Sequence, residues 1–509
     1  MHWMLVNCCL PKSMELDVNN TFSNFGKITR KVLNDEISIY YDSREWVTEP
    51  WIESEGNILF LAGWFVFNEQ RNDLQGLIES IRKHGLAYTL NRVEFGIFSG
   101  GYFDGDKLVF FTDFLSLSHH FYTLTDRFRL SPFIELIEEF AEGHNNFLVK
   151  FLDRNGYLLG NDTIFPEIKR LAPGCIIDSN SREEEVYFKF LRQNVIEVDR
   201  VPSVIKSILE KWNYNDRSIA LSSGFDSRLI FSQGLFRYVY SYGPGCSRDR
   251  KVSKRLFDLK NDAASCYDGF GFTDNIAPDG FIRISKMLFY GNQITMKDSF
   301  AASYSYSALR AKNSYVAFDG FLGGILQRGY YLRYSGIIGE VFNFFPILYR
   351  LFPPAPEKWL SIRYTADPTY AFSQFDAFIN KYGIEANWQS LQIFEVMYGR
   401  SSRKILNGGI ILNGLHKLVA PPFVHRKIFD TLIQEVPYRS VSRITFKEIW
   451  KLVATEYRSI RSEHFYSVDT PRVLIPFVAF VGRVLTHTIP AFYNYGKEHK
   501  LKRRILRNH

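Results

Sequence analysis

The run of residues from Leu221 to Ser227 carries the clearest chemical signal in this sequence. Its small residues allow backbone N–H groups to approach an anion closely, and a helix starting inside the run adds partial positive charge. Asp226 repels phosphate, so a carboxylate at this place favours a magnesium ion that bridges it to the phosphates. We therefore predict that ATP and Mg²⁺ bind at Leu221, Ser222, Ser223, Gly224, Asp226 and Ser227.

The residues on either side of this run predict a β-α-β unit. Apolar residues at helical spacing over 201–212 precede a turn over 213–216 and a short buried strand over 218–221. After the run, residues 229–231 predict the start of a helix and residues 238–242 a second strand. The order strand, loop, helix, strand is the one in which a loop can bind phosphate.

The run resembles the Ser-Gly-Gly-x-Asp-Ser signature of the N-type ATP pyrophosphatases, with Ser223 in the place of one glycine. Members of that group cleave ATP between the α and β phosphates and adenylate a substrate. Further stretches, in the same order along the chain, resemble asparagine synthetase and its relatives. They span roughly residues 58 to 450 and comprise residues 63–68, 73–83, 108–122, 171–174, 318–324, 422–425 and Lys447.

This resemblance implies an α/β fold with two domains. Residues 1–190 are expected to form an Ntn-type α/β sandwich of antiparallel sheets, similar to a glutamine amidotransferase domain. Residues 200–509 are expected to form a parallel-sheet, adenine nucleotide α-hydrolase-like (PP-loop) domain with extra C-terminal helices. By the same resemblance, Leu221, Tyr242 and Gly243 flank the adenine and ribose.

The second glycine-rich loop, Phe318 to Gly324, also follows from the resemblance. Gly320 is expected to lie beside the pyrophosphate, and Asp319 is the only carboxylate in the loop, where the family usually has more. Metal binding then depends on Asp226 and Asp319, and magnesium commonly binds through only one or two carboxylates. Lys447 takes the approximate place of the family's catalytic lysine, which would stabilise negative charge as an amine attacks an acyl-adenylate.

Two departures from the family predict that glutaminase activity is absent. Class II amidotransferases use a cysteine directly after the initiator methionine, because its α-amino group acts as base for its own thiol. Here position 2 is His2, and Ala62-Gly63-Trp64 replaces the glutamine-binding Asn-Gly-Glu. β-Lactam synthetases and lasso-peptide macrolactam synthetases resemble asparagine synthetase with a similarly inactive first half.

Three functions stay open at this point. The resemblance implies an ATP-dependent ligase that adenylates aspartate or another acid, releases pyrophosphate and transfers the acyl group to ammonia or an amine. The second is a peptide or natural-product cyclase in which the attacking amine belongs to the substrate. The third is a catalytically inactive scaffold.

Composition indicates a globular protein, because 46% of the 509 residues are hydrophobic and 16% are aromatic. The five cysteines form no Cys-x-x-Cys pair, so we expect neither a disulfide framework nor a zinc ribbon, and we expect a cytoplasmic location. Of the net charge of +8, a surplus of +5 lies in the last thirteen residues. We expect no nucleic-acid partner, and the basic tail leaves weak contact with a membrane surface open.

Two apolar segments are expected to be buried. Residues 473–493 are interrupted by Pro476, Arg483 and Pro490, so the sequence predicts no transmembrane helix there. We interpret this segment as a buried helix pair, with attachment to a membrane surface as the alternative. Residues 341–352, which three prolines follow, are interpreted as a packed helix.

Overall fold

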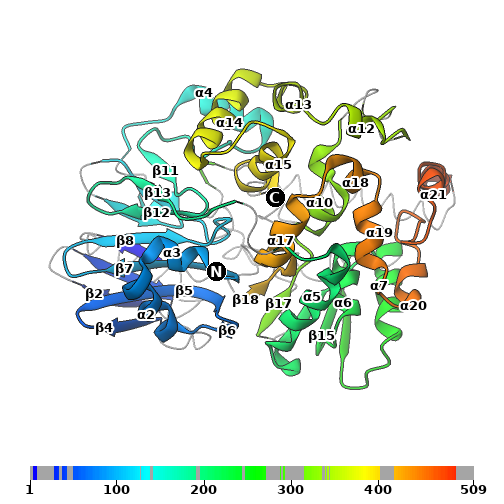
Figure 1. Cartoon of the computed structure of the whole chain (residues 1–509), viewed down its shortest axis with the longest axis horizontal. Coiled ribbons are helices and arrows are strands. Elements are labelled where there is room, and N and C mark those ends of the chain that lie inside the picture. Colours follow the sequence, from blue (N-terminus) through cyan, green and yellow to red (C-terminus); the bar gives the residue numbers. More distant parts are fainter. Residues whose placement is uncertain are drawn as a thin grey trace.

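The computed structural model describes residues 4–7, 28–33, 37–42, 50–125, 128–137, 141–190, 195–243, 247–270, 287, 290–292, 315–334, 339, 341–342, 344–401 and 418–488. The described chain is a mixed α/β protein with antiparallel sheets in its first half and a parallel sheet in its second (Figure 1). This confirms the expected fold class at the level of its sheets.

Two antiparallel sheets form the first half of the described chain. The first has six strands in the order β11 (Ile168–Arg170), β9 (Phe121–Thr123), β10 (Arg129–Ser131), β1 (Met4–Asn7), β3 (Ser38–Asp42) and β2 (Ile28–Val32). The second has the order β13 (Glu184–Val186), β12 (Cys175–Asp178), β8 (Leu108–Thr112), β7 (Phe95–Phe103), β5 (Asn57–Phe67) and β4 (Trp51–Ser54), with β6 (Gln70–Arg71) paired to β5.

The two sheets stack because each has one apolar face. Ile39 of β3 joins Phe60 of β5 and Phe110 of β8 in one buried cluster between the sheets. The other face of the second sheet packs against α2 (Leu74–His84), which is followed by α3 (Leu86–Asn91). α2 covers residues 74–83 of the stretch 73–83 that the sequence resemblance includes.

A parallel sheet forms the centre of the second half. Within the described residues it has the strand order β16 (Cys266–Phe270), β15 (Tyr238–Tyr242), β14 (Arg217–Ala220), β17 (Val316–Phe318) and β18 (Leu418–Ala420). The helices around it are α5 (Val201–Glu210), α6 (Phe225–Ser232), α7 (Arg248–Asp258), α10 (Gly323–Arg328), α17 (Arg426–Ile433), α18 (Pro437–Val441), α19 (Ile444–Trp450) and α20 (Thr455–Ser459).

The β-α-β unit predicted from the sequence is confirmed. α5 and a 3-10 turn, η4 (Tyr214–Asp216), lead into β14, and α6 connects β14 to β15. The two strands are parallel neighbours, with Ile219 opposite Val239. The run from Leu221 to Gly224 therefore lies between a buried strand and the first turn of a helix.

The remaining helices lie mainly along one side of the molecule, at the top of Figure 1. They are α4 (Asn146–Asn155), α12 (Leu348–Leu351), α13 (Pro356–Arg363), α14 (Pro368–Tyr382), α15 (Trp388–Met397) and, at the right-hand edge, α21 (Ile475–Thr488). The short 3-10 turns are η1 (Ile134–Leu136), η3 (Val198–Arg200), η7 (Tyr330–Leu332), η9 (Pro422–Val424) and η10 (Arg472–Leu474).

The two halves share one hydrophobic core. The indole N–H of Trp64 in β5 donates to the carbonyl of Val419 in β18 at 3.0 Å, and the Trp64 ring meets Trp212 edge to face. At another point the rings of Phe151 in α4 and Tyr370 in α14 lie 4.6 Å apart. The contacts of Trp64 fix the second antiparallel sheet against the parallel sheet, and the ring contact joins α4 to α14.

The described parts of both apolar segments that were expected to be buried expose large side chains instead, and residues 489–493 of the second segment lie outside the described residues. Over 341–352, residues 341, 342, 344 and α12 are helical, but Phe344 and Leu351 are 63% and 65% exposed. In α21, Phe477 and Phe480 are 66% and 62% exposed. The predictions were wrong because hydrophobic spacing identifies an apolar face but does not say whether another element covers it. Among the described residues, no helix is both long enough and apolar enough to span a bilayer.

We predict that Trp64→Phe destabilises the protein more than Trp450→Phe does. Trp450 is fully buried, but its indole N–H has no hydrogen-bond partner in the described chain, whereas Trp64 satisfies a buried carbonyl. Leaving that carbonyl unpaired lowers the free energy of unfolding by about 1–3 kcal/mol. Both variants also lose the buried area of the larger ring, so this second loss is common to them. Urea denaturation of both variants measures the difference, and equal losses would contradict this role for Trp64.

Candidate functional site

The run after β14 and the loop after β17 lie side by side at the carboxyl edge of the parallel sheet. β14 continues through α6 to β15 on one side, whereas β17 leads to β18 on the other. Ligands of open α/β sheets bind where strand connections diverge in this way. The loops containing Asp226 and Asp319 therefore lie at the expected position for a ligand.

Hydrogen bonds within the run hold its backbone in a tight turn. The N–H of Ser222 donates to Oγ of Ser227 at 3.2 Å, and the N–H of Gly224 donates to Oγ of Ser222 at 3.1 Å. Gly224 is the N-cap residue of α6 and makes no side-chain cap. The first N–H groups of α6 thus keep the polarity that attracts an anion.

The second loop packs directly onto Asp226 through glycines. A Cβ atom on Gly320 would lie 3.0 Å from Cβ of Asp226, and one on Gly323 would lie 2.7 Å from the same atom. Between them, Leu322 has a φ of 64°, a left-handed conformation. Only residues without side chains allow the two loops to approach this closely.

The carboxylate of Asp226 is held by two residues of α10. Gln327 donates to Oδ1 at 2.9 Å, and Arg328 donates to Oδ2 at 3.1 Å. Burial raises the pKa of Asp226, and the positive charge of Arg328 opposes that rise. The arrangement stabilises the ionised form of a carboxylate that burial would otherwise favour protonated.

Asp319 is the second carboxylate at this edge. Its Oδ1 accepts the N–H of Phe321 at 2.7 Å. Burial raises the pKa of Asp319 to about 6, and the negative charge of Asp226 contributes to the rise, so the two carboxylates interact. The described residues contain no group of three or more His, Cys, Asp or Glu side chains that could hold a metal. A cation here would depend on these two carboxylates, which fits magnesium completed by phosphates and water.

Two acidic residues that the sequence analysis missed approach the run from the opposite side. The N–H of Ser223 donates to Oδ1 of Asp249 in α7 at 2.5 Å, and the N–H of Glu463 donates to Oγ of Ser223 at 3.1 Å. Burial and the charge of Asp249 raise the pKa of Glu463 to about 7. Asp249 therefore occupies one of the N–H groups that a bound phosphate would use.

An arginine cluster, which we define as Arg328, Arg333 and Arg443, lies on the other side of Asp226. Arg333 donates to the carbonyl of Arg328 at 3.1 Å. Arg443 is only 6% exposed, and none of its side-chain nitrogens has a hydrogen-bond partner among the described residues. Burial lowers the pKa of Arg443 to about 10, and repulsion from Arg328 and Arg333 adds to the decrease. Unpaired buried guanidinium groups favour a bound oxyanion.

Aromatic rings support this cluster. The guanidinium of Arg443 lies 4.5 Å from the ring centre of Phe446 and 5.5 Å from that of Tyr466. The guanidinium of Arg328 lies 5.9 Å from the ring of Phe225 in α6. Cation–π contacts of this kind hold a guanidinium without using its N–H groups. The N–H groups of Arg443 are thus not used by these ring contacts.

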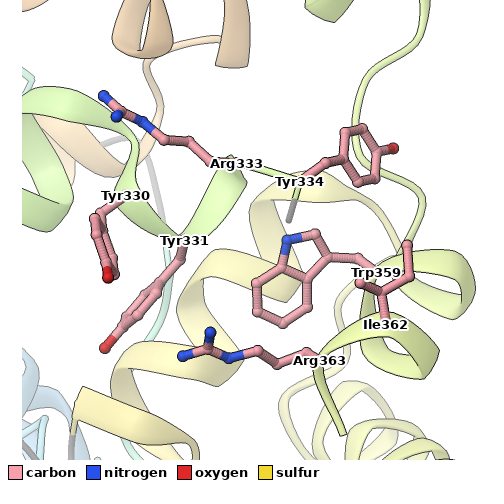
Figure 2. Close-up of a pocket in the computed structure, with 7 residues that line it drawn as sticks. All are labelled: Tyr330, Tyr331, Arg333, Tyr334, Trp359, Ile362 and Arg363. Carbon is pink, nitrogen blue, oxygen red and sulfur yellow. The ribbon is translucent and has the colours of Figure 1, made fainter. Parts of the chain in front are cut away.

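A pocket of about 210 Å³ lies beside the arginine cluster. Figure 2 shows the indole of Trp359 in its middle, with Tyr331 and the guanidinium of Arg363 on one side. The guanidinium of Arg333 points away from Trp359, so this residue contributes to the pocket wall while its charge lies elsewhere. The pocket is lined by Tyr330, Tyr331, Arg333, Tyr334, Trp359, Ile362 and Arg363.

The other predicted site residues are placed as follows. The side chain of Leu221 is 1% exposed, so only its backbone is available to a nucleotide. Tyr242 is opposite Phe270 at the end of β15, and the carbonyl of Gly243 accepts a bond from Arg250 at 3.2 Å. Lys447 is exposed on α19, one turn after the buried Arg443. No hydrogen bond or ion pair within the described chain joins Lys447 to either loop.

Comparison with known proteins assigns no family. No protein-family model matches the chain, and no curated protein matches it either.

Asp319 is predicted to make stability depend on pH. Its ordinary pKa of 3.8 applies when the chain is unfolded, and its folded pKa is about 6. Between these values the folded protein holds more protons than the unfolded chain, so stability decreases as pH rises, by about 2–3 kcal/mol for this group.

Asp319→Asn should remove this part of the decrease, as measured by urea denaturation at pH 4 and pH 7. The exposed Asp106→Asn variant is the control and should keep the dependence of the parent protein. An unchanged pH profile in Asp319→Asn would contradict the burial of this carboxylate.

Proposed function

We propose that this protein is an ATP-dependent amide-forming ligase of the asparagine synthetase type, which releases AMP and pyrophosphate. The observation that carries the proposal is the contact between the two loops, in which Gly320 and Gly323 lie against Asp226. The position of both loops at the diverging strands supports a nucleotide there. The resemblance of both loops to those of asparagine synthetase supplies the reaction class.

In the first step, an oxygen of the substrate carboxylate attacks the α phosphorus of ATP. The bond from this phosphorus to the bridging oxygen breaks, and pyrophosphate leaves with the electron pair. The N–H groups at the start of α6 and the hydroxyl of Ser222 would bind the pyrophosphate. Magnesium, held by Asp226 and Asp319, would neutralise the phosphate charge.

In the second step, ammonia or an amine attacks the acyl carbon, loses a proton and displaces AMP. Negative charge develops on the acyl oxygen and on the leaving phosphate, so cations at this place lower the barrier. Arg443 is buried and interacts electrostatically with Arg328, which pairs with Asp226, whereas Lys447 is exposed. We therefore assign this role to Arg443 and keep Lys447 as the alternative. The aromatic pocket next to Arg333 would take the side chain of the acid.

The source of the amine is not glutamine in this proposal. Trp64 stands where the resemblance expects a glutamine-binding glutamate, and its indole contacts β18 instead. Ammonia, or an amine that belongs to the substrate as in the cyclases, then completes the reaction.

A catalytically inactive scaffold is the second candidate, and a specific observation favours it. Arg328 and Gln327 occupy the oxygens of Asp226, and Asp249 occupies the N–H of Ser223. ATP binding would require these contacts to exchange for magnesium and phosphate. An inactive protein would keep them.

Pyrophosphate release is the test of the proposal. With Mg-ATP, hydroxylamine and a panel of acids that includes aspartate, we expect release that Asp226→Asn lowers by about 100-fold or more, because magnesium and phosphate charge lose their partner. Asp216→Asn, at the opposite end of β14, is the control and should retain activity. If no acid elicits release and ATP does not bind, the scaffold is the correct function.

The same assay assigns the catalytic cation. Arg443→Gln should lower the turnover rate by about 10- to 100-fold, since a buried charge beside the reacting atoms is lost, while Lys447→Gln stays near the parent rate. Retention of fold in both variants is checked by circular dichroism. The reverse order of effects would return the role to Lys447.

A further inference from the structure

An exposed apolar surface forms one edge of the second half. In residues 344–352, large apolar side chains face solvent: Phe344 is 63% exposed, Phe345 55%, Leu351 65% and Phe352 60%. Large apolar side chains gathered on the surface of a folded protein favour an interaction site.

The second part of this surface comes from η10 and α21. Val473 is 75% exposed, and Phe477 and Phe480 are more than half exposed. Phe477, Phe480 and Val484 follow the spacing i, i+3, i+7, so they share one face of α21. On another face, Gly482 packs against the ring of Phe465. The helix is therefore attached to the protein by one side and presents aromatic rings on another.

The two parts are neighbours in space. The positive charge of Arg472 in η10 acts on the hydroxyl of Tyr349 in α12 and opposes the rise in its pKa that burial causes. Arg472 also interacts with Tyr438 of α18, and α18 packs against α12. Figure 1 shows α12 and α21 at the same edge of the molecule. We call the two parts together, residues 344–352 and 473–484, the apolar edge.

Positive charges outnumber negative ones near the apolar edge, although Glu340, Glu357 and Asp469 flank its two segments. Residues 341–356 and 470–488 contain no Asp or Glu, and they contribute Arg350, Arg472 and Arg483. In the sequence after Thr488, six Lys and Arg residues accompany a single acidic residue, Glu498. A second copy of this chain would bring like charges together, so self-association is disfavoured. An anionic surface is electrostatically complementary to this edge.

We infer that the apolar edge docks on the surface of an anionic lipid bilayer. Exposed phenylalanines at helical spacing can enter the boundary between headgroups and acyl chains, while arginines and lysines attract the negative headgroups. Neither contribution needs a segment that spans the bilayer.

Docking would place the candidate site close to the bilayer surface. Arg472 at the apolar edge repels Arg333, which lines the pocket of Figure 2 and bonds to Arg328. On the other side, Phe465 contacts Gly482 of α21, and the guanidinium of Arg248 lies 4.1 Å from the centre of the Phe465 ring. Arg248 directly precedes Asp249, which accepts the N–H of Ser223 in the candidate site. The inference does not depend on the proposed ligase activity, since it concerns a different surface.

Vesicle flotation tests the inference with the full chain. We expect binding to phosphatidylcholine vesicles that contain phosphatidylserine, weak binding to pure phosphatidylcholine, and release by salt. The double variant Phe477→Asp, Phe480→Asp should bind at least about tenfold more weakly, because each buried ring contributes more than the free energy of a tenfold change. Leu235→Asp is the control, at an apolar residue that is 45% exposed outside the apolar edge.

Several results would overturn the inference. These are absence of binding to anionic vesicles, equal binding to neutral vesicles, or an equal loss in the Leu235→Asp control. Gel filtration tests whether a second copy of the chain, and not a bilayer, covers the apolar edge. A dimer of the parent protein that the double variant abolishes would show that a second copy, and not a bilayer, covers the apolar edge.

Discussion

The close approach of the two loops at the carboxyl edge of the parallel sheet is the constraint on which the candidate site depends. Gly320 and Gly323 bring the backbone after β17 against Asp226, at distances that a side chain would prevent. Because β14 and β17 are neighbouring parallel strands, this contact is a direct consequence of the sheet order. It holds Asp226, Asp319 and the start of α6 at one place.

Charge balance around Asp226 then determines what the site can bind. On one side, Arg328 pairs with Asp226. Arg333 and Arg443, the other members of the arginine cluster, repel Arg328 and each other. On the other side, Asp249 and Glu463 meet at Ser223, where they raise the energy of further negative charge. In the proposed function, magnesium would lie between Asp226 and Asp319, and phosphate oxygens would meet the arginines.

The sequence predicted local elements of structure, but it did not predict contacts between residues that are far apart in the chain. The β-α-β unit was correct because hydrophobic spacing and turn residues mark its elements, and the second loop was found by its order in the chain. Asp249, Glu463 and Arg443 gave no signal, since their contacts join residues from 26 to 240 positions apart or depend on burial. The exposed Phe344 and Phe480 were assigned to the interior because the composition of an apolar segment does not reveal what covers it.

Calorimetric titration of ATP into the protein, with and without magnesium, tests whether the two loops form a nucleotide site. If the two loops form a nucleotide site, ATP should bind in the presence of magnesium, and Asp226→Asn should weaken that binding by about tenfold or more. ATP binding that is the same without magnesium and in Asp226→Asn would contradict a nucleotide site at these loops. Absence of binding at high ATP concentration would contradict it as well.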